Sequence, residues 1–146
     1  MNATVTVETT KPRAPNMIEL IEAKTPGHSN LSMCIQCGTC GGSCPSGADM
    51  EHTPRQIFAL LRAELLDEVL SSNTPWYCVS CYLCTVRCPQ EVRITDIMYT
   101  LKNMAIAKKK VSQKAASDWS KTFIGAVDKN GRSFELGLAT RQFLRY

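Results

Sequence analysis

The chain has 146 residues, of which 44% are hydrophobic and 21% charged, with eight cysteines and a formal net charge of +4. No apolar run approaches the roughly 20 residues that a membrane-spanning helix needs, and the first fifteen residues lack the apolar block of a secretory signal. We therefore expect a cytoplasmic chain with no membrane span of its own. In that reducing compartment, eight cysteines indicate metal or redox chemistry and disfavour disulfides.

The N-terminal part, residues 1–30, is expected to contain an arm and a short helix. Residues 1–15 are rich in threonine, proline and polar residues, which is typical of an extended or disordered arm. Residues 16–24 predict a helix that ends at Pro26 and Gly27. The side chains expected to face inward are Met17, Ile18 and Ile21.

The cysteines form an internal repeat. The first cysteine run, residues 34–45, reads CIQCGTCGGSCP, and the second cysteine run, residues 78–89, reads CVSCYLCTVRCP. Each run has the spacing C-x2-C-x2-C-x3-C-P, and the two runs are offset by 44 residues.

Helices are predicted on either side of the second run, and no strand pattern of comparable strength appears. Between the runs, Thr53 is expected to cap a helix over residues 53–70 that has Pro54 at its first position. The inward positions of this helix are Ile57, Phe58, Leu61, Leu65 and Val69. After the second run, Thr95 is expected to cap another helix. Its inward positions are Ile97, Met98, Leu101, Met104 and Ala105.

The C-terminal tail, residues 108–146, is expected to be helical. A helix over residues 113–128 should stop at Asn130 and Gly131. Residues 101–132 carry a net charge of +6, which favours a solvated helix face, leaves an acidic protein partner open, and disfavours nucleic acid because no recognition motif accompanies it. At the end of the chain, a docking patch and a terminal helix folded back on its own core both stay open. The apolar residues concerned are Leu136, Leu138, Phe143 and Leu144.

The spacing of the cysteines points to iron–sulfur clusters. Three cysteines separated by two residues each can wrap around three corners of a cubane, and in two-cluster ferredoxins the fourth cysteine, before proline, ligates the other cluster. We therefore predict two [4Fe–4S] clusters with crossed ligands. The ligands are Cys34, Cys37, Cys40 and Cys88 for the first cluster, and Cys78, Cys81, Cys84 and Cys44 for the second. Crossed ligation makes the clusters neighbours and couples folding to cluster assembly. Structural zinc would leave part of each run unused.

Other side chains are expected to support the clusters rather than to react. No catalytic residue is predicted. His28 and His52 are expected at the surface or in capping roles, because eight thiolates already match the eight iron corners. The hydroxyls that could tune the clusters are those of Thr39, Ser43, Ser80 and Thr85, although surface solvation is the favoured interpretation of each. The aromatic residues expected to shield the second cluster, with partner contact as the alternative, are Trp76, Tyr77 and Tyr82.

With a helical linker between its two runs, the chain resembles the α-helical ferredoxin fold over residues 31–107. The expected class is therefore mainly α, with an extended N-terminal arm and a helical C-terminal tail. Within this fold, the chain is similar to the HdrC-like family, the C subunits of heterodisulfide reductase. The motifs that carry the similarity are the first run, Thr53-Pro54-Arg55, residues 76–82 (WYCVSCY), residues 88–94 (CPQEVRI) and the helix that follows at Asp96-Ile97.

This resemblance implies an electron-transfer subunit of a hetero-oligomeric complex. Single electrons would arrive from an HdrA-like subunit, which contains flavin and iron–sulfur clusters, and leave to an HdrB-like subunit with CCG motifs. One alternative is the iron–sulfur subunit of another dehydrogenase, of the succinate or glycolate type, or of a quinone-interacting oxidoreductase. A cluster-binding module that senses redox state or is purely structural is the other alternative.

Overall fold

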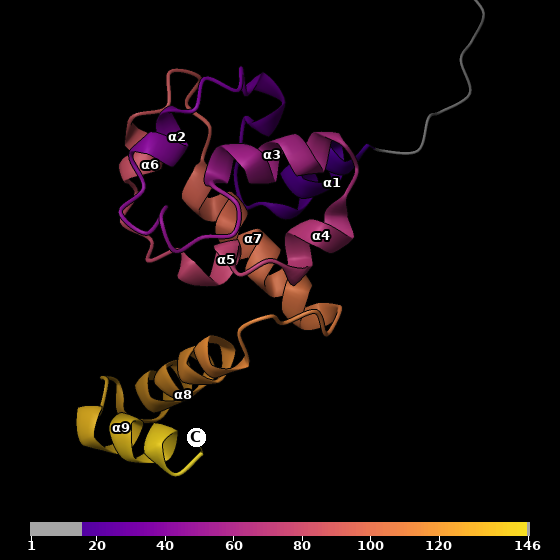
Figure 1. Cartoon of the computed structure of the whole chain (residues 1–146). Coiled ribbons are helices and arrows are strands. Elements are labelled where there is room, and N and C mark those ends of the chain that lie inside the picture. The colour runs from indigo at the N-terminus through magenta and orange to yellow at the C-terminus, as the bar shows by residue number, and fades with distance from the viewer. Residues whose placement is uncertain (1–15, 146) are drawn as a thin grey trace, which may run out of the picture.

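A computed structural model describes residues 16–145, so the predicted arm over residues 1–15 lies outside the described residues. Within the described range the chain is helical and has no β-strand, which confirms the predicted mainly-α class (Figure 1). The elements in chain order are α1 (Met17–Lys24), the 3-10 turn η1 (Leu31–Met33), α2 (Thr39–Gly42), α3 (Pro54–Arg62), α4 (Leu66–Ser71), α5 (Thr74–Tyr77), α6 (Leu83–Val86), α7 (Ile94–Ala107), α8 (Lys114–Asn130) and α9 (Glu135–Phe143).

Helix α3 begins where the sequence predicts. The Thr53 side chain accepts a hydrogen bond from the Gln56 backbone N–H, and the Gln56 side chain accepts one from the Thr53 backbone N–H. This reciprocal pairing satisfies two backbone donors that the first turn of a helix leaves unbonded. Pro54 follows at the first helical position, where its missing N–H costs nothing.

The prediction of a single helix over residues 53–70 is wrong, because the helix is interrupted at Glu64 and divided into α3 and α4. Glu64 has a positive φ of 61°. The Leu65 N–H bonds the Leu60 carbonyl and the Glu64 N–H bonds the Leu61 carbonyl, which is the Schellman pattern of a helix end. The break shifts the apolar register, so Leu65 is 46% exposed and Leu66 is buried in its place. No glycine signals this stop in the sequence.

The core lies between α1, α3, α4 and α7. Helix α1 packs against α3 and α7, α3 packs against α4, and both α4 and α5 pack against α7 (Figure 1). The predicted inward residues of α7 are all buried, as is Ile21 of α1. The N-cap of α7 is Arg93, however, and Thr95 lies inside the helix, so the predicted cap at Thr95 is wrong.

The C-terminal tail forms a helical hairpin beside this body. Helix α8 ends at Gly131, whose φ of 69° suits the left-handed stop predicted there. Helix α9 packs against α8, away from the core of the body, and buries Leu138 (Figure 1). Leu136, Phe143 and Leu144 stay exposed.

None of the helices in the described part of the chain is both long and apolar enough to cross a membrane. The division into residues 1–30, 31–107 and 108–146 stays a prediction.

Candidate metal centre

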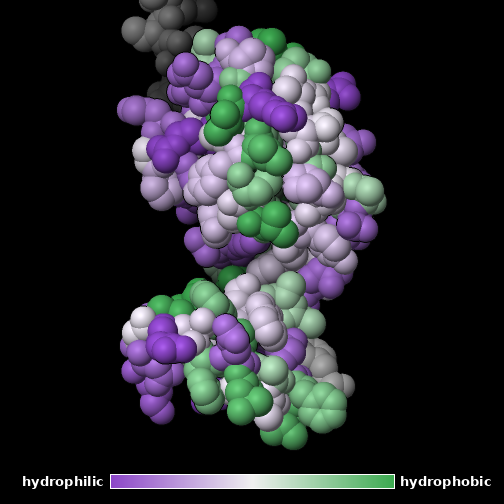
Figure 2. All heavy atoms as spheres, turned by 90° about the vertical axis from the view of Figure 1, so that its left-hand side faces the viewer, coloured by the Kyte–Doolittle hydropathy of each residue, from purple (hydrophilic) through white to green (hydrophobic). Residues whose placement is uncertain are grey.

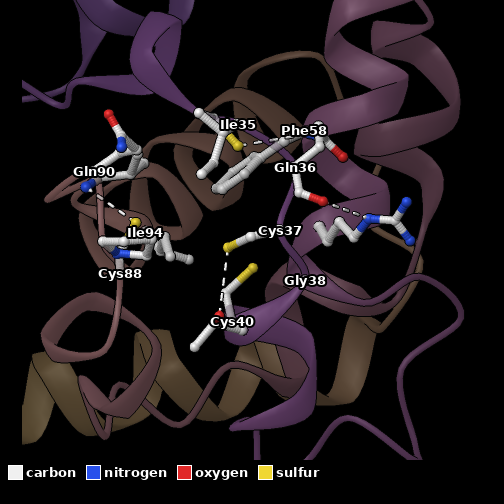
Figure 3. A pocket seen from close by; sticks show the side chains of 14 residues that line it. Ile35, Gln36, Cys37, Gly38, Cys40, Phe58, Cys88, Gln90 and Ile94 are labelled. Atoms are coloured by element: carbon white, nitrogen blue, oxygen red, sulfur yellow. Dashed lines mark hydrogen bonds between the residues drawn. The ribbon is translucent and has the colours of Figure 1, made fainter.

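The first cavity lies where α3, α7 and the two cysteine runs meet. Four cysteines are among the residues that line it: Cys34, Cys37, Cys40 and Cys88. Figure 3 shows Cys37 and Cys40 pointing into the cavity and Cys88 lying across from them. The thiol from the second run therefore lies beside three thiols of the first run. Phe58, Val92 and Ile94, all buried, supply part of the apolar wall.

The second cavity is built in the same way from the opposite set. Its lining includes Cys44, Cys78, Cys81 and Cys84, so here the last thiol of the first run lies beside three thiols of the second. Met98 and Met50 contribute to the wall. The buried residue Ile94 lines both cavities, so the cavities are neighbours.

The two runs share a backbone conformation. Gln36 and Ser80 occupy the same place in the repeat and both have positive φ, 61° and 58°. Gly38 and Tyr82, two residues later, also match, with φ of 88° and 61°. The short helices α2 and α6 begin directly after these residues and pack against each other. Glutamine, serine and tyrosine rarely adopt a left-handed conformation. We infer that the surroundings of each loop impose this backbone path.

Hydrogen-bond donors reach several of the cysteine sulfurs. The Val92 backbone N–H lies 3.4 Å from Cys88 Sγ, and Gln36 Nε2 lies 3.6 Å from Cys34 Sγ. Among the predicted hydroxyls, Thr39 Oγ1 lies 3.4 Å from Cys37 Sγ. Ser43 Oγ instead donates to the Thr39 carbonyl. Thr95 Oγ1, predicted as a helix cap, lies 3.9 Å from Cys84 Sγ.

Burial dominates the acidity of several thiols. It raises the pKa of Cys40 to about 11, and it also raises the pKa of Cys44 and Cys84. At exposed Cys37, the hydrogen bond from Thr39 lowers the pKa. A buried thiol such as that of Cys40 is therefore protonated near neutral pH in the chain by itself. Because iron binds the thiolate, cluster insertion must release that proton.

Cationic side chains bind backbone carbonyls inside both runs. Arg62 Nη2 donates to the carbonyl oxygen of Cys34, and Arg55 Nε donates to that of Gln36 over 3.2 Å. In the second run, Lys102 Nζ donates to the carbonyl oxygen of Cys78 over 3.1 Å. Burial lowers the pKa of Lys102, and the nearby Cys78 acts in the opposite direction. These contacts could not be predicted from the sequence, because Arg62 and Lys102 are 28 and 24 positions along the chain from their partners.

The other predicted supporting residues have mixed outcomes. Tyr82 lines the second cavity, whereas Trp76 lines a groove between α7 and α8, and Tyr77 lines neither cysteine cavity. His28 is exposed, as predicted. His52 donates its backbone N–H to Thr74 Oγ1 over 3.1 Å and lies apart from the thiols that line the cavities.

Apolar side chains gather on the face of the body that carries the runs. Figure 2 shows a stripe of hydrophobic surface on this face, the side of the molecule where Figure 1 places α2 and α6. Ile35 and Val79, which line the first and second cavity, are 59% and 67% exposed. Val86 of α6 is 82% exposed. Exposed apolar surface of this kind often marks a site of contact with another protein.

The donor sets fit iron–sulfur clusters. All eight cysteines fall within the described residues and are free, and each cavity has four of them in an otherwise largely apolar lining. Within residues 16–145, no three His, Cys, Asp or Glu side chains gather as they would around a single metal ion. A cubane takes one thiolate at each of four separate corners, so its ligands stand around a space and do not converge on one point.

Comparison with known proteins gives the same chemistry. Residues 30–92 match the 4Fe-4S dicluster domain family. This match, together with the eight cysteines, gives the domain two [4Fe–4S] clusters and confirms the predicted cofactors.

Curated relatives share this part of the chain. A Methanocaldococcus jannaschii protein, named as an iron-sulfur C subunit of CoB--CoM heterodisulfide reductase, is 40% identical over 111 residues, which cover 73% of this chain and 58% of that protein. The C subunit of the Methanothermobacter marburgensis H(2):CoB-CoM heterodisulfide,ferredoxin reductase is 44% identical over 82 residues, covering 56% and 44% of the two chains. The C subunit of the Methanosarcina mazei ferredoxin:CoB-CoM heterodisulfide reductase is 37% identical over 90 residues, covering 62% and 55%.

The chain spans about half the length of the curated relatives that it matches. Over the shared residues, the relatives confirm the resemblance to the HdrC-like family of heterodisulfide reductase that the cysteine runs and the linker indicate.

Proposed function

Because residues 30–92 belong to the 4Fe-4S dicluster domain family, we propose that this chain relays single electrons between two protein partners and has no catalytic site of its own. The observation that carries the proposal is the pair of neighbouring four-cysteine cavities that share Ile94. When bound, the clusters supply one-electron oxidation and reduction without a proton or group transfer.

The proposed ligands follow the crossed pattern. The first cluster takes Cys34, Cys37, Cys40 and Cys88, and the second takes Cys78, Cys81, Cys84 and Cys44. The lining of each cavity supports this division, because each holds three thiols of one run and the last thiol of the other. Each run is thereby bound to both clusters, so the two loops must fold together around them.

The protein keeps both sites partly shielded from water. Phe58 and Val92 line the first cavity, Met98 lines the second, and Ile94 lines both. The exposed apolar residues at the rims, such as Ile35 and Val79, leave the runs accessible to a partner protein. A relay needs both features, since its redox centres must be held within a stable body and still approach those of its partners.

The proposed partners are two subunits of a heterodisulfide reductase-type complex, the HdrA-like one with flavin and iron–sulfur clusters and the HdrB-like one with CCG motifs. The relatives support this assignment, because their names describe the C subunits of such reductases. The Methanothermobacter marburgensis name includes both hydrogen and ferredoxin, whereas the Methanosarcina mazei name includes ferredoxin alone. We place the complex in the cytoplasm, where eight free thiols stay reduced. The α8–α9 hairpin is a further candidate for partner contact.

Anaerobic purification tests the cofactor content and the partners together. The chain, purified with its native companions, should hold about eight irons and eight acid-labile sulfides. A co-purified subunit with CCG motifs supports the proposed complex, whereas a flavin dehydrogenase alone favours the iron–sulfur subunit of another dehydrogenase. Clusters that none of the companions reduces would contradict the relay and favour a structural or sensing role.

A further inference from the structure

Arg62 and Lys102 make matched contacts in the two cysteine runs. Arg62, the last residue of α3, donates to the carbonyl oxygen of Cys34, and Lys102, in the middle of α7, donates to that of Cys78. Cys34 and Cys78 are each the first cysteine of their run. The same backbone oxygen of the repeat is therefore bound twice by a cation, each time from a different helix.

A neutral donor would be enough to fix these carbonyls. Arg55, two helical turns before Arg62 and on the same face of α3, adds a second guanidinium to the first run through the Gln36 carbonyl. Arginine and lysine at these places therefore bring positive charge beside the thiols as well as hydrogen bonds.

A positive charge close to an iron–sulfur cluster affects the reduction of that cluster. A cluster held by four thiolates is anionic, and reduction adds one more negative charge to it. A fixed cation nearby stabilises the reduced form more than the oxidised form. The effect grows as the cation is removed from water, because screening by solvent weakens.

We propose that Arg62 and Lys102 are positioning residues that hold a positive charge beside the first and the second cavity, respectively, and so raise the reduction potential of the cluster bound in each. The inference rests on the proposed ligand division and specifies how the chain sets the two potentials. Lys102 is half-buried and Arg62 is exposed, so Lys102 has the larger effect.

The test is an anaerobic redox titration of the cluster-loaded chain, followed by electron paramagnetic resonance. Lys102→Gln and Arg62→Gln keep a hydrogen-bond donor but remove the charge. Lys102→Arg and Arg62→Lys keep the charge with a different donor geometry. Lys129→Gln, on the outer end of α8, is the control for an equal change in net charge far from both cavities.

We expect each glutamine variant to lower one midpoint potential and to leave the other unchanged, with a different midpoint affected in each. Lys102→Gln should lower the equilibrium constant for one-electron reduction about tenfold, which is 59 mV. Arg62→Gln should lower it roughly threefold, because its charge is screened. The charge-conserving variants and Lys129→Gln should leave both midpoints near those of the parent chain.

Iron and sulfide contents are measured on every sample, which separates this inference from the proposed function. Unchanged midpoints in glutamine variants that retain about eight irons overturn the inference and leave the relay intact. Equal shifts of both midpoints also overturn it. If a glutamine variant loses iron, the charge-conserving variant decides, since a tenfold change there attributes the contact to geometry and not to charge.

Discussion

The first and second cysteine runs follow the same backbone path in different surroundings. Both contain left-handed residues at equivalent places, and both lead into a short helix. The first run has glycine at position 38 and arginine contacts from α3, whereas the second has tyrosine at position 82 and a lysine contact from α7. Two sites with one loop path can therefore differ in the cationic side chains that contact them.

The largest expected effect comes from removing one cysteine thiol, which reports the cavity that the thiol serves. Cys88→Ala removes a thiol of the second run, but it should disturb the same spectral component as Cys40→Ala, because both thiols line the first cavity. Iron analysis should show a loss of up to about four irons per chain in each variant. Cys84→Ala is the matched control from the second cavity. If Cys88→Ala resembles Cys84→Ala instead, the ligands are not crossed.

The next largest effect is expected from truncating buried side chains that line the cavities. Phe58→Ala should cost about 3–5 kcal/mol and Met98→Ala about 2–5 kcal/mol, since both side chains are fully buried. Faster cluster loss to a chelator should occur at the first cavity for Phe58→Ala and at the second for Met98→Ala, but at both for Ile94→Ala.

The control for these variants is Ile21→Ala, which is equally buried but lines neither cavity. It should lower the thermal midpoint without favouring one spectral component over the other. A uniform loss of both components in Phe58→Ala and Met98→Ala alike would show that the cavities do not behave as separate sites.

Local signals and the repeat account for what the sequence could predict. The Thr53 cap, the inward residues of α7 and the stop at Gly131 follow from patterns within a few residues. The break at Glu64 could not be predicted, because a glutamate takes the left-handed conformation that glycine normally marks. Thr95 looked like a cap but lies near Cys84, a contact that only the folded chain reveals.

The candidate site likewise has a part that the sequence predicts and a part that it does not. The cysteines and their spacing are local, so the two clusters follow from the sequence and a known ligand pattern. The carbonyl contacts of Arg62 and Lys102 join distant segments, and neither residue stands out from other basic residues of the chain.

A smaller effect is expected at the glycines of the first run. Gly38→Ala should destabilise the cluster-loaded chain by about 1–2 kcal/mol, because φ at position 38 is 88°. Gly42→Ala should instead be neutral or stabilising by up to about 1 kcal/mol, since a Cβ there meets nothing within 4 Å. The equivalent residue in the second run, Val86, already has an exposed side chain.

Urea unfolding under anaerobic conditions checks the glycine pair. A midpoint that falls equally for Gly38→Ala and Gly42→Ala would show that the run tolerates no side chain at either place, whatever its backbone conformation.

The smallest expected effect concerns the helix that carries Arg55 and Arg62. Thr53→Ala removes the cap of α3 and should cost about 1 kcal/mol of unfolding free energy. Thr53→Ser keeps the hydroxyl and should behave like the parent chain. Circular dichroism during urea unfolding measures both, and an equal loss in the serine variant would attribute the effect to packing of the threonine methyl group.

Two four-iron clusters that lie side by side with crossed ligands would be visible in an anomalous-difference map collected at the iron edge of the cluster-loaded protein. We expect two neighbouring four-iron centres, one among Cys34, Cys37, Cys40 and Cys88 and the other among Cys44, Cys78, Cys81 and Cys84. A centre ligated by all four cysteines of a single run, or a single metal ion among these thiols, would contradict this expectation.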